Sequence, residues 1–196
     1  SKLNDSMEDI DLNLEDFIVK VNSDLVGKFI NIPSRTSGFI KKYFNNTLVS
    51  TNEISIHDAK VIVDDLIAIK DEVISLYEAR LFSKLNRLLM SYTEKVNEYV
   101  NRLEPWVLAK NIDEHKSMSQ LHQVCSAALQ AFRVISIYYS PIMPDLTHKI
   151  AEFYGESNYQ SIDAIYENIK NISDYNHLLT RLEKDAIDLM LSKNSS

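Results

Sequence analysis

The sequence predicts an all-α protein, with a bundle of about five helices followed by a C-terminal helical tail. Three glycines and four prolines in 196 residues are too few for the many tight turns of a β-rich fold. Apolar residues also recur at intervals of three and four along several long stretches of the chain. The composition, 45% hydrophobic and 25% charged, is that of an ordinary globular protein.

Composition divides the chain into three parts. Residues 1–14 are acidic and irregular, and we expect them to form a linker. Residues 15–155 carry the helical periodicity and make up the predicted domain. Residues 156–196 begin with a polar stretch rich in Tyr and Asn and end with a predicted helix at about 182–191. The domain therefore stands between a linker and a tail.

The first helix is predicted from about Glu15 to Phe44. Its apolar residues share one side of a helical projection and cover roughly half of the circumference. Pro33 interrupts the pattern, because an interior proline lacks an N–H group and clashes with the preceding turn. The sequence thus predicts either a kink or a junction of two helices at Pro33.

The stretch from His57 to Leu103 has 47 residues without Gly or Pro. This length exceeds that of a usual globular helix, so we expect two helices with a break near residues 76–82. The next boundary lies at Glu104, because Pro105 disfavours helical geometry in the residue before it.

Two further helices complete the predicted domain. One fits Met118 to Tyr139 and is stopped by Pro141. A shorter one begins at Pro144, since proline is favoured in the first turn, and ends at Gly155.

Polar residues form a narrow stripe on the first helix, opposite its apolar side. Its members are Lys28, Asn31, Arg35, Gly38 and Lys42. An ordinary solvated face explains such a stripe. However, Asn is a poor helix former, and here it lies one turn from an Arg. Both side chains can make two hydrogen bonds to the edge of a nucleic-acid base.

Trp106 is the single tryptophan of the chain and follows Pro105 directly. Most tryptophans are largely buried in a core, which is the structural alternative here. The position at a helix end, outside an apolar stripe, instead favours a stacking platform. Single-stranded RNA is read by such aromatic rings, on which unstacked bases are laid.

Catalytic and metal-binding patterns find little support in the sequence. Gly-rich phosphate loops are absent, and Cys125 lies on the apolar face of a predicted helix, where we expect a buried structural thiol. His122 and Cys125 lack the second pair of ligands that zinc requires, so we expect no metal site. We also expect no catalytic residues in this chain.

The remaining composition indicates the setting. One cysteine excludes an internal disulfide and favours a reducing compartment. No run of 18 apolar residues occurs, so we expect no membrane span. The net charge of −7 argues against a large surface that tracks phosphates. A domain that reads only a few bases escapes this objection.

Several blocks of the sequence resemble one known family, the methionyl-tRNA synthetases. The resemblance is carried by residues 8–17, 21–35, 38–40, 77–84, Pro105-Trp106-Val107-Leu108-Ala109-Lys110, Cys125, Phe132-Arg133 and Pro141-Ile142-Met143-Pro144. It covers roughly residues 8–154, and a weaker match follows at 177–183. One departure is Pro33, where similar sequences usually have Ala.

The resemblance implies an anticodon-binding helix bundle that recognises the CAU anticodon of methionine tRNA. The matching family residues contact and stack on the first anticodon base, cytosine, which assigns anticodon binding to Asn31, Arg35 and Trp106. Pro105 would fix the position of the indole, and we add Lys28 and Lys42 of the polar stripe as supporting residues. The implied setting is the cytoplasm.

The family's catalytic parts have no counterpart in this chain. They use ATP and include a nucleotide-binding fold and a zinc-binding insertion, so the resemblance implies no cofactor for the 196 residues themselves. It implies that 1–14 link to a catalytic domain and that 156–196 pack on it. Leucines and isoleucine of the tail, at 178, 179, 182, 187 and 189, would then be partly uncovered here. The full-length protein would be a class I methionine–tRNA ligase.

Two other hypotheses remain open from the sequence. The chain could be the helical anticodon domain of another class I aminoacyl-tRNA synthetase, since such bundles share an architecture. It could also be a helical protein-interaction module, which long acidic amphipathic helices permit. A CAU-bearing RNA hairpin distinguishes all three.

Overall fold

A computed structural model describes residues 14–111, 114–159 and 161–183. The helical elements in chain order are α1 (Leu14–Lys20), η1 (Val21–Phe29), α2 (Asn31–Phe44), η2 (Thr51–Glu53), α3 (His57–Ala68), α4 (Lys70–Glu78), α5 (Phe82–Leu103), α6 (Pro105–Leu108), η3 (Ala109–Asn111), α7 (His115–Tyr139), α8 (Pro144–Phe153) and η4 (Ile162–Tyr166). Within this described part the fold is all-α, as predicted, and five helices (α2, α3, α5, α7 and α8) have ten or more residues.

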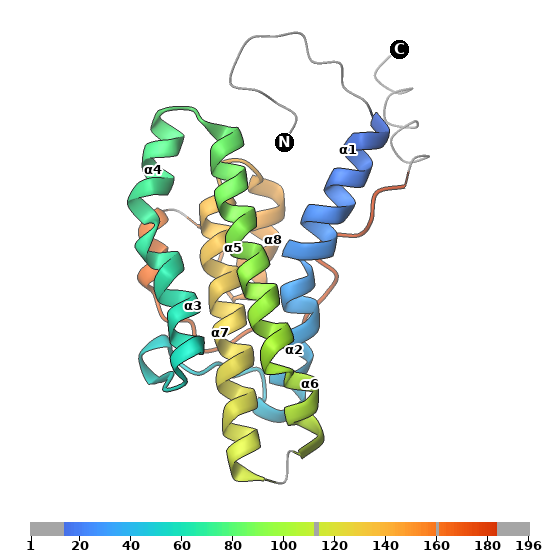
Figure 1. The fold of residues 1–196 in the computed structure, drawn as a ribbon, viewed down its shortest axis with the longest axis vertical. Coiled ribbons are helices and arrows are strands. Elements are labelled where there is room, and N and C mark those ends of the chain that lie inside the picture. Colours follow the sequence, from blue (N-terminus) through green and yellow to red (C-terminus); the bar gives the residue numbers. More distant parts are fainter. Residues whose placement is uncertain (1–13, 112–113, 160, 184–196) are drawn as a thin grey trace.

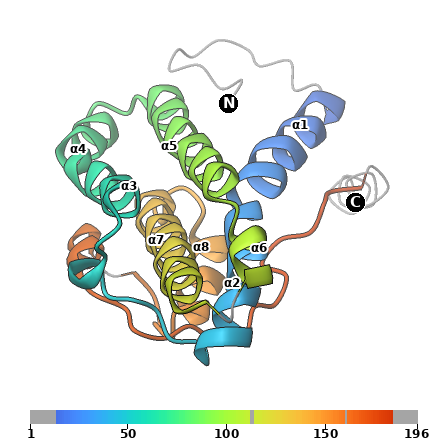
Figure 2. The same cartoon turned by 60° about the horizontal axis from the view of Figure 1, so that its bottom comes forward.

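Helix α7 forms the centre of the bundle (Figures 1 and 2). It packs against α2, α3, α5, α6 and α8, and every residue from Val124 to Tyr139 is buried. Phe132 at its middle is fully buried and lies 4.7 Å from the ring centre of Phe29. A helix that is buried all round must sit inside the core, so the other helices take their positions from α7.

The region around Pro33 is a junction of two helices. The segment η1 is π-helical: Ile30 donates its backbone N–H to the carbonyl of Leu25, five residues earlier, at 2.8 Å. Helix α2 then starts at Asn31, so Pro33 lies in its first turn. Backbone N–H groups of a first turn have no partner inside the helix, so the missing donor of Pro33 leaves no helical bond unmade.

The long stretch from 57 to 103 contains the predicted break and one more. Arg80 has a φ of 57° between α4 and α5, which confirms the break within residues 76–82. A second junction, at Ile69 between α3 and α4, was not predicted. No Gly or Pro marks it, so local sequence carried no signal there.

The proline boundaries are confirmed. Glu104 closes α5 in the left-handed region with φ 43°, and Pro105 is the first residue of α6. Helix α7 ends at Tyr139, two residues before Pro141. Helix α8 begins at Pro144 and is followed by Gly155 with φ +72°, a conformation that favours glycine.

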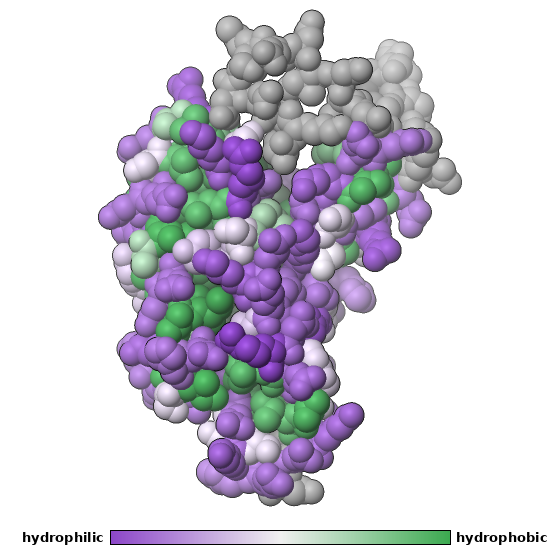
Figure 3. Space-filling view, in the orientation of Figure 1, coloured by the Kyte–Doolittle hydropathy of each residue, from purple (hydrophilic) through white to green (hydrophobic). Residues whose placement is uncertain are grey.

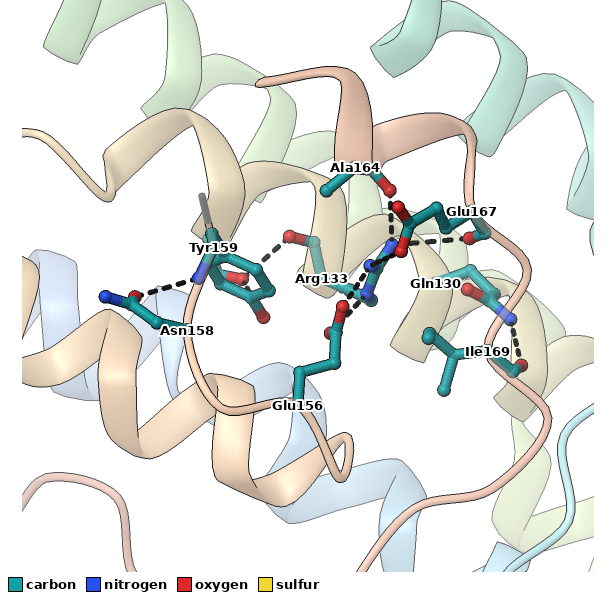
Figure 4. A network of polar contacts seen from close by, with 9 residues as sticks. Gln130, Arg133, Glu156, Asn158, Tyr159, Ala164, Glu167 and Ile169 are labelled. Atoms are coloured by element: carbon teal, nitrogen blue, oxygen red, sulfur yellow. Dashed lines mark hydrogen bonds and ion pairs between the residues drawn. The ribbon is translucent and has the colours of Figure 1, made fainter. Parts of the chain in front are cut away.

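The segment after α8 is bound to the bundle by a buried polar network (Figure 4). Arg133 on α7 is 1% exposed, and its Nε donates to Glu156 Oε2 at 2.8 Å while a terminal nitrogen donates to Oε1 at 2.5 Å. The other terminal nitrogen donates to the carbonyl oxygens of Ala164, at 2.9 Å, and Glu167. One buried guanidinium therefore holds two stretches of the following chain against α7.

Part of the predicted tail belongs to the same core. Tyr159, Ile165, Ile172 and Leu178 are buried in it. Leu179 and Leu182 are half-buried, whereas positions 187 and 189 lie outside the described residues. The predicted helix at 182–191 also lies outside them, except for its first two residues, which are not helical. Packing of the tail on a catalytic domain stays a prediction.

Candidate functional site

The predicted polar stripe lies against α5 in a regular ladder. Lys28 Nζ donates to Glu94 Oε1 at 2.6 Å and Asn31 Nδ2 donates to Asn97 Oδ1 at 3.3 Å. A terminal nitrogen of Arg35 donates to Asn101 Oδ1 at 2.7 Å. Each pair is 66 residues apart in the chain. A constant separation requires that the η1–α2 rod and α5 run in the same direction, as Figure 1 shows.

The ladder corrects one expectation about the stripe. We expected it to face away from the packed side of the helix, but Asn31 and Arg35 are half-buried because α5 lies beside them. Lys42 is not part of the ladder: it is exposed, and its ammonium lies 4.8 Å from the ring centre of Tyr43. A helical projection shows which residues share a face, but it does not show what that face contacts.

Asn97 and Asn101 were missed in the sequence. Asn97 Nδ2 donates to the Lys28 carbonyl at 2.9 Å and to the Thr93 carbonyl at 3.0 Å, so Asn97 binds the backbone as well as Asn31. One signal could have revealed both asparagines. Residues 94, 97 and 101 repeat the three- and four-residue steps of 28, 31 and 35.

Trp106 follows the last pair of the ladder, Arg35–Asn101, along the chain. A one-residue corner at Glu104, between α5 and α6, sets its position. Glu104 ends α5 by donating to the Val100 carbonyl, and its own carbonyl accepts from Val107 at 2.8 Å. Pro105 is buried and is the first residue of α6, so it fixes where that helix starts. Trp106 is half-buried and packs on the core edge, so it is neither a core tryptophan nor a fully exposed one.

Arg35 connects the ladder with the indole. Its guanidinium carbon lies 5.0 Å from the centre of the Trp106 ring, a cation–π distance. The structure therefore brings two of the predicted base-reading residues, Arg35 and Trp106, into contact and places the third, Asn31, one helical turn before Arg35 in the same ladder. Figure 2 shows α2, α5 and α6 close together in this part of the bundle.

The charges around Lys28 are paired. The hydrogen bond to Glu94 raises the pKa of Lys28, burial lowers it, and Asp24 adds to the rise, so that the net pKa is above its ordinary value. Asp24 also binds Lys20, at 2.5 Å. In the view of Figure 3 the face over α5 is mostly hydrophilic, with apolar residues in small areas among charged ones. Around Lys28 itself, the charges of Lys20, Asp24 and Glu94 are thus paired with one another or with Lys28.

The donors and acceptors suit a base edge. Among the described residues, Asn31 uses only its amide nitrogen and Arg35 one terminal nitrogen in the hydrogen bonds of the ladder. The Asn31 Oδ1 acceptor and further guanidinium N–H donors stay available beside an aromatic ring. A planar ligand with both donors and acceptors on one edge fits such an arrangement.

The other candidate groups have structural roles. Cys125 is fully buried in α7, as predicted, and burial raises the pKa of its thiol. His122 stacks on Phe44 at 3.9 Å and 3°, and its Nε2 lies 2.7 Å from the Thr47 carbonyl oxygen. In the described parts of the chain no three His, Cys, Asp or Glu side chains are grouped to hold a metal ion. None of the helices that the structure describes is long and apolar enough to cross a membrane.

Comparison with known proteins identifies relatives of this chain. No protein-family model matches it. It is 40% identical over 99% of its length to the methionine–tRNA ligase of Ralstonia nicotianae and 39% identical over 99% to that of Cupriavidus necator. The chain spans 27% of the length of each relative, and the matched part is their C-terminal region.

Among solved structures, the fold resembles the apo form of methionyl-tRNA synthetase from Mycobacterium tuberculosis. The TM-score is 0.77, with 88% of this chain and 35% of that chain covered. The sequence identity is 17%, so this likeness supports the fold alone.

Proposed function

Since the chain is a homologue of the C-terminal region of methionine–tRNA ligases, we propose that it recognises the CAU anticodon of methionine tRNA. The observation that carries the proposal is the contact between Arg35 and Trp106, with Asn31 one helical turn before Arg35 in the same ladder. The named relatives are methionine–tRNA ligases, which favours this anticodon over that of another class I synthetase. A half-exposed indole bound to an arginine favours a base platform over a general protein-interaction module.

In the proposed complex, the first anticodon base stacks on Trp106. The guanidinium of Arg35 covers that ring in the free protein, so it must turn toward the base edge as the base enters. Cytosine presents two acceptors, O2 and N3, and one amino donor on its Watson–Crick edge. Arg35 donates to the acceptors, and Asn31 Oδ1 accepts from the amino group.

Uracil is the natural test of this assignment. It has a carbonyl where cytosine has an amino group and an N–H where cytosine has an acceptor. Asn31 Oδ1 and Arg35 would each face a group of their own kind. An unpaired group in a partly dry site costs about 1–3 kcal/mol, enough to distinguish CAU from UAU.

The remaining steps of the enzyme lie in the rest of such a protein. The chain spans about a quarter of its relatives' length, and we assign the ATP- and methionine-dependent chemistry to the other three quarters. The net charge of −7 offers little attraction for phosphates. The domain then contributes specificity, and the rest of the protein supplies most contacts to the tRNA backbone.

Trp106 fluorescence tests the proposal directly, because it is the sole indole. We expect an RNA hairpin with a CAU loop to quench this fluorescence at low salt, and a UAU hairpin to bind at least about tenfold more weakly. Hairpins with other anticodons run in parallel. Equal binding of CAU and UAU would overturn the proposal, and preference for a third anticodon would assign the domain to another synthetase.

A further inference from the structure

The chain after α8 forms a strap across the outside of the bundle; we use this name for residues 161–183. In Figure 1 it leaves η4 beside α3 and α4 and ends beside α1. Its backbone pairs with distant parts of the chain. Leu48 donates to the Lys170 carbonyl at 2.7 Å, and Ile172 donates to the Asn46 carbonyl at 2.9 Å. Together with the Arg133 network, these bonds hold the first half of the strap.

In the second half of the strap, Asp174 binds Lys41 at 2.7 Å and Asn46 at 3.1 Å, and a polar anchor of a different kind follows at Leu182. Leu182 donates its backbone N–H to Asn22 Oδ1 at 2.8 Å, and Asn22 Nδ2 donates to the Leu182 carbonyl at 3.0 Å. A single side-chain amide thus satisfies both backbone groups of one residue, as a neighbouring strand would do. The two residues are 160 positions apart, so no local geometry explains this pair.

Asn22 belongs to the π-helical segment that also carries the first rung of the ladder. The strap is bound near the start of η1, at Asn22, whereas α5 is bound near its end, where the Lys28 carbonyl accepts from Asn97. The same Asn97 accepts from Asn31. The nine-residue segment η1 is therefore held at both ends: the strap binds it near its start, and α5 binds it near its end.

A π-helical segment is a strained alternative to α-helix, and it persists where surrounding contacts hold it. If η1 converted to an α-helix, each backbone N–H group would bond to the carbonyl four residues earlier instead of five. One end of the segment would then turn relative to the other by about 100°. The bond to Leu182 opposes this turn at the upstream end, and Asn97 opposes it downstream.

We propose that Asn22 is a latch that couples docking of the strap to the orientation of the base-reading residues. This inference rests on the proposed function for its RNA readout only. When Leu182 is bound, η1 keeps the register in which Asn31 meets Asn97. When Leu182 is released, η1 relaxes and Asn31 loses that register. Coupling between two sites is reciprocal, so a base bound at Asn31 and Arg35 also strengthens docking of the strap.

The test uses the complete 196-residue chain and three variants. Asn22→Ala removes the latch from the helix side. Asn22→Asp keeps the acceptor for the Leu182 N–H group but replaces the amide donor with a second oxygen that repels the Leu182 carbonyl, so it is a nearly isosteric variant that stays informative if the first variant folds poorly. Asn176→Ala is the matched control, because Asn176 is exposed in the same strap. The RNA-free readouts are the rate of tryptic cleavage after the exposed Arg181 and the side-chain amide NMR signals of Asn31 and Asn97.

For both latch variants we expect faster cleavage after Arg181 and shifted amide signals of Asn31 and Asn97. We also expect CAU hairpin binding to weaken by about fivefold or more, whereas Asn176→Ala matches the wild type. Cleavage that accelerates without any change in the amide signals and the hairpin affinity would overturn the latch, and so would cleavage at the wild-type rate. Shifted amides in a chain that does not distinguish CAU from UAU would support the latch and contradict the proposed function.

Discussion

Arg35 and Trp106 are bound to each other in the free protein, with 5.0 Å between the guanidinium carbon and the centre of the indole ring. Arg35 also donates to Asn101 at 2.7 Å, so its planar group is held in place from two sides. A base that stacks on the indole takes the place of the guanidinium on the ring, and the guanidinium then turns its donors toward the base edge. The pair therefore gives the proposed site both its stacking surface and its hydrogen-bonding edge.

Arg35→Lys tests the shape of this group separately from its charge. Lysine keeps the positive charge but lacks the planar fork that stacks on a ring and binds a base edge with two bonds. We expect CAU hairpin binding to weaken by about 1–3 kcal/mol in fluorescence titrations. Arg102→Lys is the matched control, because Arg102 lies on α5 with an exposed side chain paired to Asp58. Equal losses in the two variants would contradict a specific role of Arg35.

Asn97→Ala tests how the ladder contributes to stability. The change removes the acceptor of Asn31 and the donor to the carbonyls of Lys28 and Thr93. We expect the free energy of unfolding in urea to fall by about 1–3 kcal/mol, because half-buried groups lose their partners. Asn101→Ala, at an exposed position with one bond to Arg35, should cost less. A larger loss for Asn101→Ala than for Asn97→Ala would show that the half-buried Asn31–Asn97 pair is not the stabilising part of the ladder.

Glu156→Ala tests the buried ion pair. Arg133 is 1% exposed, and its charge would be left without its bidentate carboxylate. We expect a loss of about 3–5 kcal/mol in the free energy of unfolding, measured by urea denaturation. Glu167→Ala provides the control, since its carboxylate lies 3.9 Å from the same guanidinium but is 67% exposed. That variant should stay within about 1 kcal/mol of the wild type.

The pH dependence of stability includes a contribution from Asp24. Burial raises the pKa of this carboxyl, but the hydrogen bond and charge of Lys20 and the charge of Lys28 outweigh burial, so the net pKa lies below 3.8. The unfolded chain therefore binds this proton more readily than the folded one. The stabilising contribution is complete above the unfolded pKa and is lost as the pH falls through the folded pKa.

Asp24→Asn should thus be less stable than the wild type near neutral pH, and the difference should shrink as the solution is acidified to about pH 3 and below. The measurement is urea unfolding across this range. Asp64→Asn, at an exposed position on α3, is the control and should show no such convergence. A difference that grows in acid would have the wrong sign for a lowered pKa.

Cys125 should be unreactive in the folded protein. Its side chain is fully buried and burial raises the pKa of the thiol, so the reactive thiolate is scarce. We expect a chromogenic disulfide reagent at about pH 8 to label the native chain far more slowly than the urea-unfolded chain. Because Cys125 is the sole cysteine, the signal has one source. Fast labelling of the native chain would mean that α7 opens readily.

Most of the helical pattern follows from local sequence. Periodicity placed α7, and the length of the stretch without Gly or Pro indicated the break before α5. The geometry of proline placed the boundaries at Glu104 and Pro141 and the start of α8 at Pro144. Burial of Cys125 followed from its place on an apolar face. The junction at Ile69 escaped prediction, because it has neither a breaker residue nor a change in periodicity.

The sequence by itself determined that this protein is a helix bundle and which three residues could read a base. Only the tertiary structure decided that Asn31 and Arg35 face α5, that Asn97 and Asn101 support them, and that Asn22 binds the strap. These pairs join positions 66 and 160 apart. Helical periodicity reports which residues share a face, because it depends on neighbours within two turns. What that face meets depends on the packing of the whole chain around α7.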